Sequence, residues 1–551
     1  MASRKIRTVL FLVALVSLAA LPVTAQSFRV QCPTSTITHP DHSTGQLLNS
    51  SEPQYNAPTA LSVLTHGYME PTGNINGAIK CQQLSGGDGF ATMADGTQTY
   101  LFAFGPLSGI SHIANGQAGS EFPNVFNTVF PGTLVPGDPA TTLDGGGTFT
   151  YNGAVGLAPD LDNGNAIDGH VDPRQIEDVA VMNGNMPGPL MAIDEDDEFF
   201  LTLTNVGMIM RPDLFEQHTV HFHGYPNASA LYDGVPDASV AINIGGSFTY
   251  YYLAPDAGTY FWHCHITPPE HLQMGMVGQL YVRPRQNRVQ VGQDLYAALQ
   301  KQQGDLRTAC RRPGDGVSPP VAVGVIPDFA CSNPVPAIHP STAITRAATG
   351  TTCNGGILAN NAPKYAYNDG DGSTCYDVEL PLQMHGFDPN FHFVGMTFNP
   401  EAFVDMKDKY FLLNGRSYPD TVNTSAMETQ TSDGRNHLSQ PMPAVVTMTA
   451  GQRALLRIAC LDVSEYQTLA SLGIRMHVIG YNAKLLRDEA GHNLDYYTNS
   501  ITLAGGESLD VILDSTGVAP HTVFYLYTPQ LDHLSNDAEN FGGLMTEVHV
   551  N

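Results

Sequence analysis

The chain of 551 residues is poor in several residue types. It has one tryptophan and eight cysteines, and charged residues make up only 14% of it. No C-x-x-C-H run occurs, which argues against covalently attached haem. Beyond the first 25 residues, no apolar stretch has the length that a membrane span requires. The 25 basic residues are outnumbered by 52 acidic ones, which argues against nucleic acid or an anionic membrane as a partner.

The N-terminus has the pattern of an export signal. Three basic residues among the first seven precede the apolar run Val9–Leu21, and the small residues Val23–Ala25 fit a cleavage site. We therefore expect residues 1–25 to be a signal peptide. The mature protein is predicted to be exported, periplasmic or extracellular, without a membrane span. Its formal charge would change from −27 to −30, since three basic residues and no acidic residue are lost.

Helical periodicity is scarce along the chain. Short runs of β-branched and aromatic residues alternate with turns rich in Gly, Pro, Asn and Asp, which predicts β-sandwiches. Four such runs are Phe199–Thr204, Ser247–Leu253, Val445–Thr449 and Ser508–Leu513. The length allows two to four domains. The expected fold class is therefore all-β.

Two short histidine runs carry most of the chemical information. Residues 218–224 read HTVHFHG and residues 263–265 read HCH, and a histidine and a methionine follow at positions 271 and 276. A blue copper site takes two imidazoles, one thiolate and a weak axial thioether. The sequence supplies that set in His218, Cys264, His271 and Met276, so it predicts a type 1 copper site.

Strand geometry separates a second set of ligands from the first. Successive side chains of a strand point to opposite faces. Cys264 should therefore face one way while His263 and His265 face the other, and His221 and His223 should share a face by the same rule. Four imidazoles would then converge behind the cysteine. The backbone between the two sets would be a short path for electrons.

Residues 218–282 resemble the multicopper oxidase family of cupredoxins. Residues 218–224 match the family's H-x2-H-x-H-G motif, and residues 263–276 match H-C-H followed by H-x3-G-M. Five residues separate His265 from His271, where the family usually has three; the nitrite reductase branch has a longer loop there. The resemblance implies type 1 copper at the first set. It implies a catalytic type 2/type 3 copper cluster that reduces oxygen at His221, His223, His263 and His265.

A weak internal repeat suggests two similar halves. His221–Gly224 in the first half corresponds to His477–Gly480 in the second, and Thr259–Val282 corresponds to Thr522–Val550. The parallel suggests two cupredoxin-like Greek-key β-sandwich domains, with an irregular insertion near 105–170 in the first. The expected boundaries are residues 26–286 for domain 1, 287–365 for a linker that contains cysteines, and 366–551 for domain 2.

The second half is poor in metal ligands. Phe524–Tyr527 stands where Trp262–His265 would align, so no cysteine is available for a second blue site. Two histidines remain in positions that resemble those of trimeric copper nitrite reductases. His533 resembles the residue that completes the type 2 copper of a neighbouring subunit, and His477 resembles one that acts in proton delivery. The resemblance thus offers both as tentative site residues and implies a homotrimer.

Differences between the nitrite reductase pattern and the oxidase pattern indicate the type of enzyme. The nitrite reductase pattern has an aspartate in place of His221 and a non-ligand in place of His265, so both residues favour the oxidase pattern. A complete trinuclear cluster takes eight histidines, whereas the matched motifs supply four. His385 and His392 are further candidates that no motif matches.

The sequence therefore predicts a laccase-like enzyme or metallo-oxidase. It would oxidise a small-molecule or metal-ion reductant, or a small electron-donor protein, at type 1 copper and reduce O2 at the histidine cluster. Two alternatives stay open. One is a nitrite reductase-like enzyme with a single type 2 copper at His223, His263 and a neighbour's His533. The other is a non-catalytic electron carrier with type 1 copper alone.

The remaining cysteines agree with export, because an oxidising compartment favours disulfides. We expect pairing among Cys310, Cys331, Cys353 and Cys375, and a bridge between Cys32 and Cys81, although connectivity does not follow from sequence. Cys460 lies in an apolar strand and is predicted to be a buried free thiol. Finally, the acidic run Asp194–Glu198 is interpreted as a solvated edge, with a cation site as the alternative.

Overall fold

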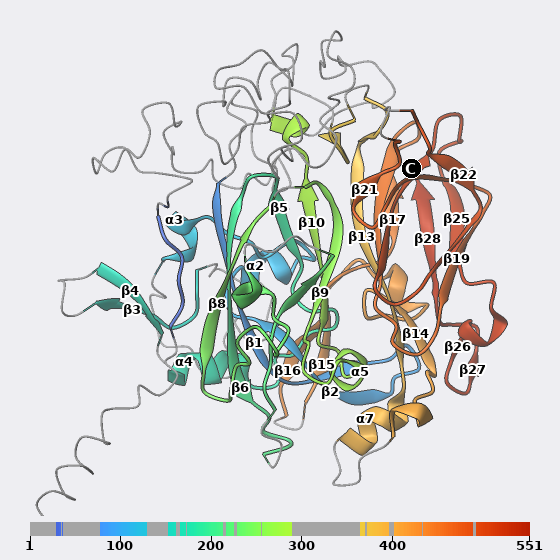
Figure 1. Ribbon diagram of the computed structural model, residues 1–551. Coiled ribbons are helices and arrows are strands. Elements are labelled where there is room, and N and C mark those ends of the chain that lie inside the picture. The colour runs from blue at the N-terminus through green and yellow to red at the C-terminus, as the bar shows by residue number, and fades with distance from the viewer. Residues whose placement is uncertain are drawn as a thin grey trace, which may run out of the picture.

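A computed structural model gives the three-dimensional structure of the chain (Figure 1). The expected signal peptide, most of the expected linker and much of the insertion lie outside the described residues. The described residues are 29–34, 36, 78–128, 153–160, 166–171, 173–212, 216–224, 229–254, 256–288, 364–369, 372–395, 402–431, 434–488 and 492–551.

The first domain is a sandwich of two four-stranded sheets with the strand orders β2-β1-β6-β8 and β5-β10-β9-β7. Strand β1 runs parallel to β6, and β5 runs parallel to β10, while the other pairs are antiparallel. Leu84, Phe102, Leu203 and Leu280 are among the buried side chains between the sheets. The strands are β1 (Ile79–Thr92), β2 (Gln98–Pro106), β5 (Met191–Asp194), β6 (Glu198–Gly207), β7 (His221–His223), β8 (Ser247–Leu253), β9 (Gly258–His263) and β10 (Val277–Arg283).

The second domain is a larger sandwich, at the right of Figure 1. Its nine-stranded sheet has the order β21-β20-β24-β18-β13-β14-β26-β27 with β22 added to β20, and its five-stranded sheet has the order β17-β28-β25-β19-β23. Leu456, Val511, Leu526 and Val548 belong to the buried core between them. The strands are β13 (Val378–Phe387), β14 (Tyr410–Leu413), β17 (Val446–Met448), β18 (Arg453–Cys460), β19 (Gln467–Leu472), β20 (Met476–Tyr481), β21 (Lys484–Leu485), β22 (Tyr496–Thr498), β23 (Ser500–Leu503), β24 (Glu507–Asp514), β25 (Thr522–Tyr527), β26 (Ser535–Asn536), β27 (Glu539–Asn540) and β28 (Met545–Val550).

Helices are few and short in the described part of the chain, and the predicted all-β class is confirmed. Three of the runs predicted as strands lie within β6, β8 and β24, and the fourth, Val445–Thr449, extends one residue beyond β17 at each end. Three two-stranded sheets pair β3 (Leu157–Asp160) with β4 (Ala166–Val171), β11 (Lys364–Tyr365) with β12 (Cys375–Tyr376), and β15 (Met427–Gln430) with β16 (Asn436–Gln440). The α-helices are α2 (Ile110–Ile113), α3 (Pro123–Phe126), α4 (Pro173–Ala180), α5 (Pro268–Gln273) and α7 (Pro389–Gly395).

Hydrogen bonds between buried groups join the two domains along β9 and β10. Thr259 Oγ1 donates to Asp510 Oδ1 at 2.6 Å, and Ser508 Oγ donates to the Thr259 carbonyl at 2.7 Å. Gln279 Nε2 donates to the Arg457 carbonyl at 2.7 Å. Strand β9 leads directly into the His-Cys-His run, so the second domain holds the strand that positions that run.

Trp262, the single tryptophan, lies in the core one residue before the His-Cys-His run. It is fully buried, and its ring packs on Phe104 at a centroid distance of 4.7 Å. Two glycines leave room for the indole. A Cβ at Gly188 would stand 3.0 Å from the ring, and a Cβ at Gly278, which faces Trp262 across the β9–β10 pair, would overlap it.

We expect Gly278→Ala to lower the free energy of unfolding by roughly 2–3 kcal/mol, because overpacking a dense core costs about 1–3 kcal/mol. Backbone strain does not contribute, since Gly278 does not have a positive φ angle. Denaturant unfolding of the metal-free protein measures the effect. An unchanged midpoint would show that the strand pair can separate enough to admit the methyl group.

The acidic run Asp194–Glu198 is not a solvated edge, so that interpretation is wrong. It turns from β5 into β6, and none of its five residues is more than 2% exposed. Lys80 Nζ lies 2.9 Å from Asp194 and 3.0 Å from Asp197. Arg283 pairs with Asp194, and Arg285 pairs with Asp196. Buried carboxylates need such partners, because an unpaired buried charge is very costly.

The cysteine predictions are confirmed where the structure describes them. Cys32 and Cys81 form a disulfide, and Cys375 is disulfide-bonded. Cys264 and Cys460 are free and buried. The other three cysteines, Cys310, Cys331 and Cys353, lie outside the described residues.

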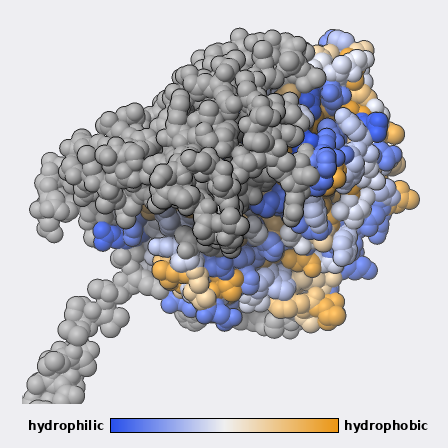
Figure 2. All heavy atoms as spheres, turned by 45° about the horizontal axis from the view of Figure 1, so that its top comes forward, coloured by the Kyte–Doolittle hydropathy of each residue, from blue (hydrophilic) through white to orange (hydrophobic). Residues whose placement is uncertain are grey.

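The described surface is mixed in polarity, and over the second domain hydrophilic side chains are interspersed with smaller hydrophobic groups (Figure 2). Exposed hydrophobic side chains of this domain include Leu472, Tyr497 and Val523. Among the described residues, no helix has both the length and the apolar character that crossing a bilayer requires.

Candidate metal centre

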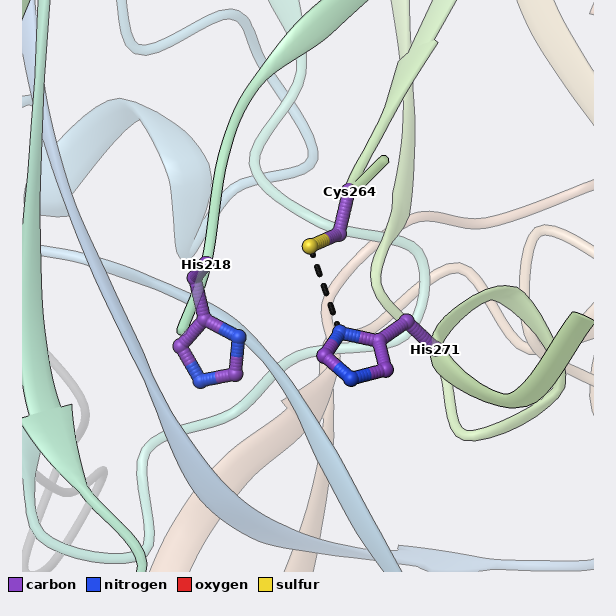
Figure 3. Close-up of side chains that lie close together, drawn as sticks. All are labelled: His218, Cys264 and His271. Carbon is purple, nitrogen blue, oxygen red and sulfur yellow. Dashed lines mark hydrogen bonds between the residues drawn. The ribbon is translucent and has the colours of Figure 1, made fainter. Parts of the chain in front are cut away.

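The first predicted ligand set meets in the core of domain 1 (Figure 3). His218 precedes β7, Cys264 follows β9, and His271 lies on α5. All three are fully buried, and one ligand atom from each lies within 4.8 Å of the others. His271 Nδ1 is 3.2 Å from Cys264 Sγ. These three residues therefore offer two imidazole nitrogens and one sulfur to a common point.

Met276 lies on the same side as these ligands. It is fully buried, and the Cys264 amide donates to its carbonyl at 3.1 Å. The β1 backbone passes close to the site at Gly86. A Cβ there would stand 2.7 Å from His218 Cδ2 and 3.4 Å from Met276 Cε. Met274, the other methionine next to Gly275, is also fully buried.

The electrostatics of the first set fit a metal ion. Both ring nitrogens of His218 are buried and have no hydrogen-bond partner in the described part of the chain. The Thr219 amide donates to Cys264 Sγ at 3.4 Å. Burial alone would raise the pKa of the Cys264 thiol, but His271 and His218 outweigh it and hold that pKa well below its usual value. A thiolate beside an unpartnered imidazole is the donor set that a soft transition metal prefers.

The outer edge of His271 faces a carboxylate. Glu216 Oε2 lies 3.5 Å from His271 Nε2, and its side chain is 26% exposed. The neighbouring His271 ring lowers the pKa of Glu216. Burial would lower the pKa of His271, but the Cys264 thiolate and Glu216 together raise it to about 10. This ring thus links the buried sulfur to an edge of the protein that solvent reaches.

The second predicted set forms on the opposite side of Cys264. Strand β7 pairs with β9, which places His221 opposite His263. The ring centroid of His221 lies 5.8 Å from that of His223, 5.3 Å from that of His263 and 5.1 Å from that of His265. His221, His223 and His263 each offer one nitrogen within 4.8 Å of the others. His265 stands beside these three as a fourth ring.

The environment favours the neutral form of two of these imidazoles, His223 and His263. Burial lowers the pKa of His263 to about 3. His223 is exposed, but partial desolvation of its ring, together with the neighbouring His221 and His265, also lowers its pKa. His263 Nδ1 lies 2.8 Å from the Cys264 carbonyl, and His221 Nδ1 lies 2.7 Å from the Asp233 carbonyl. A histidine that donates one N–H to a carbonyl presents its other nitrogen to a metal. The Nε2 atoms of His221 and His263 are therefore the ligand atoms that this geometry prepares.

A cavity of about 460 Å³ opens beside this second set, between the two domains. His223, His263 and Phe261 line it from domain 1, and Asp462 and Glu465 line it from domain 2. A small molecule in this cavity would reach both histidines. Sequence reasoning did not find the cavity, because its two walls are about 200 residues apart and meet only through domain packing.

Two tentative ligands in domain 2 have partners within the chain. His533 is 1% exposed, and its ring nitrogens lie 3.1 Å from Gln467 and 2.9 Å from Glu465, the latter lining the cavity. His477 Nε2 lies 3.1 Å from Asp495, and its ring stacks on Tyr497. A role at a neighbouring subunit's copper would require His533 to give up one of its contacts, so that role stays a prediction.

The chain is similar in part to several known proteins. A family model described as multicopper oxidase matches residues 166–287. Laccase abr2 of Aspergillus fumigatus is 35% identical over 109 residues, which are 19% of this chain and 17% of that protein. L-ascorbate oxidase of Cucumis sativus is 32% identical over 123 residues, 21% of this chain and 19% of that enzyme.

Two further relatives come from bacteria. Copper-containing nitrite reductase of Rhizobium meliloti is 36% identical over 109 residues, 19% of this chain and 26% of that enzyme. The crystal structure of blue copper oxidase from Nitrosomonas europaea superposes with a TM-score of 0.45 at 16% identity, over 85% of each chain. The sequence matches to the laccase, the ascorbate oxidase and the nitrite reductase span about a quarter or less of each relative's length.

The segment that carries both ligand sets is therefore a multicopper oxidase domain. Its match to this family model agrees with the resemblance of its two motifs.

Proposed function

We propose that this protein is an exported copper-dependent oxidoreductase of the multicopper oxidase type. It would oxidise a small-molecule or metal-ion reductant one electron at a time and reduce O2. The observation that carries the proposal is the arrangement around Cys264, whose sulfur meets His218 and His271 on one side while His221, His223 and His263 gather on the other. Copper in these sites would supply one-electron redox chemistry at the first and oxygen reduction at the second.

The protein's own residues define a route between the two sites. Cys264 is bonded through the backbone to His263 and His265, so the sites are joined by a few covalent bonds. The site around Cys264 is buried in the core, which excludes water from it and keeps the ligands in place. The cavity beside His223 and His263 gives O2 a place next to the second site.

The reductant would transfer its electron at the His271 edge. Glu216 lies at this edge and is partly exposed. Its carboxylate can accept a hydrogen bond from a phenol or attract a cation. The formal charge of −27 also favours the binding of cationic reductants, because an acidic surface raises the local concentration of cations.

A nitrite reductase-like reaction is the second candidate function. The observation that favours it is that His223 and His263, the two ligands that this candidate takes from one chain, each offer a nitrogen to a common point beside the cavity. The similarity to a copper-containing nitrite reductase points the same way. A homotrimer with His533 or His477 at a neighbouring subunit's site belongs to this candidate. An electron carrier without turnover is the third.

Copper per chain, measured on fully loaded protein by elemental analysis, is the test. About four coppers with O2 uptake would support the oxidase, about two with nitrite consumption would support the nitrite reductase-like enzyme, and about one without turnover would leave an electron carrier. Absence of copper from loaded protein would overturn the proposal. Mass determination of the mature protein would show whether residues 1–25 are removed.

A further inference from the structure

Two buried histidines of domain 2 belong to neither metal set. His385 lies in β13 and His392 lies in α7, and neither is more than 1% exposed. Both reach across the domain boundary to residues 272–275. That short segment joins His271 to Met276, two of the four predicted type 1 ligands.

The two rings face successive carbonyls of this segment. His385 Nε2 lies 3.0 Å from the Leu272 carbonyl, and its Nδ1 has no partner among the described atoms, so the ring carries its hydrogen on Nε2 and donates it. His392 Nε2 lies 2.8 Å from the Gln273 carbonyl, and its Nδ1 lies 2.5 Å from the Tyr100 carbonyl. Burial lowers the pKa of His392 to about 3, so the neutral ring donates to one of these carbonyls at a time.

The side chain of Gln273 is bound by domain 2 as well. Its Nε2 donates to Asp408 Oδ1 at 3.0 Å, and its Oε1 accepts the Asp388 amide at 3.0 Å. Gln273, Asp388 and Asp408 are all buried. The buried amide therefore finds both of its partners in the other domain.

The ends of the same segment are fixed by domain 1. The Met276 amide donates to the His271 carbonyl at 2.9 Å, and the Cys264 amide donates to the Met276 carbonyl at 3.1 Å. Domain 1 thus closes the loop, and domain 2 holds its middle. The Leu272 carbonyl also accepts the Gly275 amide at 3.0 Å, so the domain 2 donor adds a second hydrogen bond to it. Loss of a buried hydrogen bond is costly, so removal of the domain 2 donors would loosen the hold on the loop.

We propose that His385, His392 and Asp408 are positioning residues for the type 1 copper site, and that together they form a clamp on residues 272–275. The second domain would thereby set the placement of His271 and Met276 although it contributes no ligand to this site. The copper part of this inference rests on the proposed function. Its physical basis is that groups holding the ligands in place tune both the affinity and the redox properties of a metal.

The experiment compares His385→Leu with His385→Gln. Leucine removes the donor, whereas the glutamine amide can restore a bond to the Leu272 carbonyl. In the copper-loaded protein, we expect His385→Leu to weaken copper binding at the blue site roughly tenfold, measured by competition with a chelator. This is the lower end of the effects seen when a residue that supports a metal ligand is lost. His385→Leu should also shift the reduction potential and the blue band, and His385→Gln should recover most of each change. His437→Leu, at another buried histidine of domain 2, is the matched control.

A second readout needs no copper. The amides of Met274, Gly275 and Met276 bond within the loop, so their hydrogen exchange reports its stability. In the metal-free protein, His385→Leu should speed their exchange while the amides of β18 and β24 keep theirs. Unchanged exchange together with unchanged affinity and potential would overturn the clamp. Equal changes in His385→Gln and His385→Leu would also overturn it, because they would show a packing effect only.

The two readouts separate the clamp from the proposed function. If the wild-type protein takes up no copper, the proposed function fails, but faster loop exchange in His385→Leu would still support the clamp. Gln273→Met removes the contacts to Asp408 and Asp388 by a change in domain 1. This variant would be measured instead if His385→Leu does not fold. Unchanged exchange in Gln273→Met would then count against the clamp.

Discussion

Replacing Cys264 with serine is expected to abolish the blue absorption and to lower oxidation of any reductant by more than about 100-fold, because loss of even an outer-sphere partner costs roughly 10–100-fold. The sulfur lies in a buried site between His218 and His271, and the described part of that site offers copper no replacement thiolate. The blue absorption of the proposed site would depend on a bond between copper and this sulfur. A hydroxyl at the same position would leave two imidazoles without the soft ligand that selects copper.

Visible absorption and copper content of the variant measure this effect. The chain provides a matched control in Cys460, the other buried free cysteine, which lies in β18 of the second domain. Cys460→Ser should keep the full blue band and normal turnover. A Cys264→Ser protein that stays blue, with native unfolding behaviour, would contradict the assignment of the first site.

The second large effect is expected from His223→Ala. His223 belongs to the three-histidine set but is exposed, so its removal should leave the fold intact. We expect the blue band to remain, because the first site keeps all its ligands. Turnover of O2, or of nitrite in the alternative reaction, should fall more than about 100-fold, since the second site would lose one of the ligands that place its copper.

Steady-state turnover together with copper content tests this expectation. His492→Ala removes a solvent-exposed histidine that pairs with Asp488, and it should leave both quantities unchanged. A His223→Ala protein that retains full turnover would place the reaction at the first site alone. That result would favour a chain that transfers electrons without reducing a substrate at the histidine set.

The two ligand sets could be predicted because their determinants are local. Alternation along β9 separates Cys264 from His263, and pairing of β7 with β9 brings His221 beside it. The extra residues after His265 form the start of α5, which presents His271 to the sulfur. The sequence showed the longer spacing between His265 and His271, but it did not predict the helix that accommodates this spacing.

Other features depend on contacts between distant segments and could not be predicted. The acidic run Asp194–Glu198 is buried because β1 and β10 bring Lys80 and Arg283 to it, and neither cation is near it in sequence. His385 and His392 looked like candidate ligands, but the packing of domain 2 turns both toward backbone carbonyls. The roles of His477 and His533 stay predictions, because they depend on a neighbouring subunit.

The position of Trp262 gives this protein an intrinsic optical probe. The chain has one tryptophan and 23 tyrosines, so emission excited at long ultraviolet wavelengths that tyrosine does not absorb comes from a single indole. This indole is fully buried and lies two residues from Cys264. A nearby copper ion quenches such emission by energy or electron transfer. Filling of the metal site can therefore be followed in real time without a label. The same emission, moving to longer wavelength as water reaches the indole, would report unfolding of domain 1 separately from domain 2.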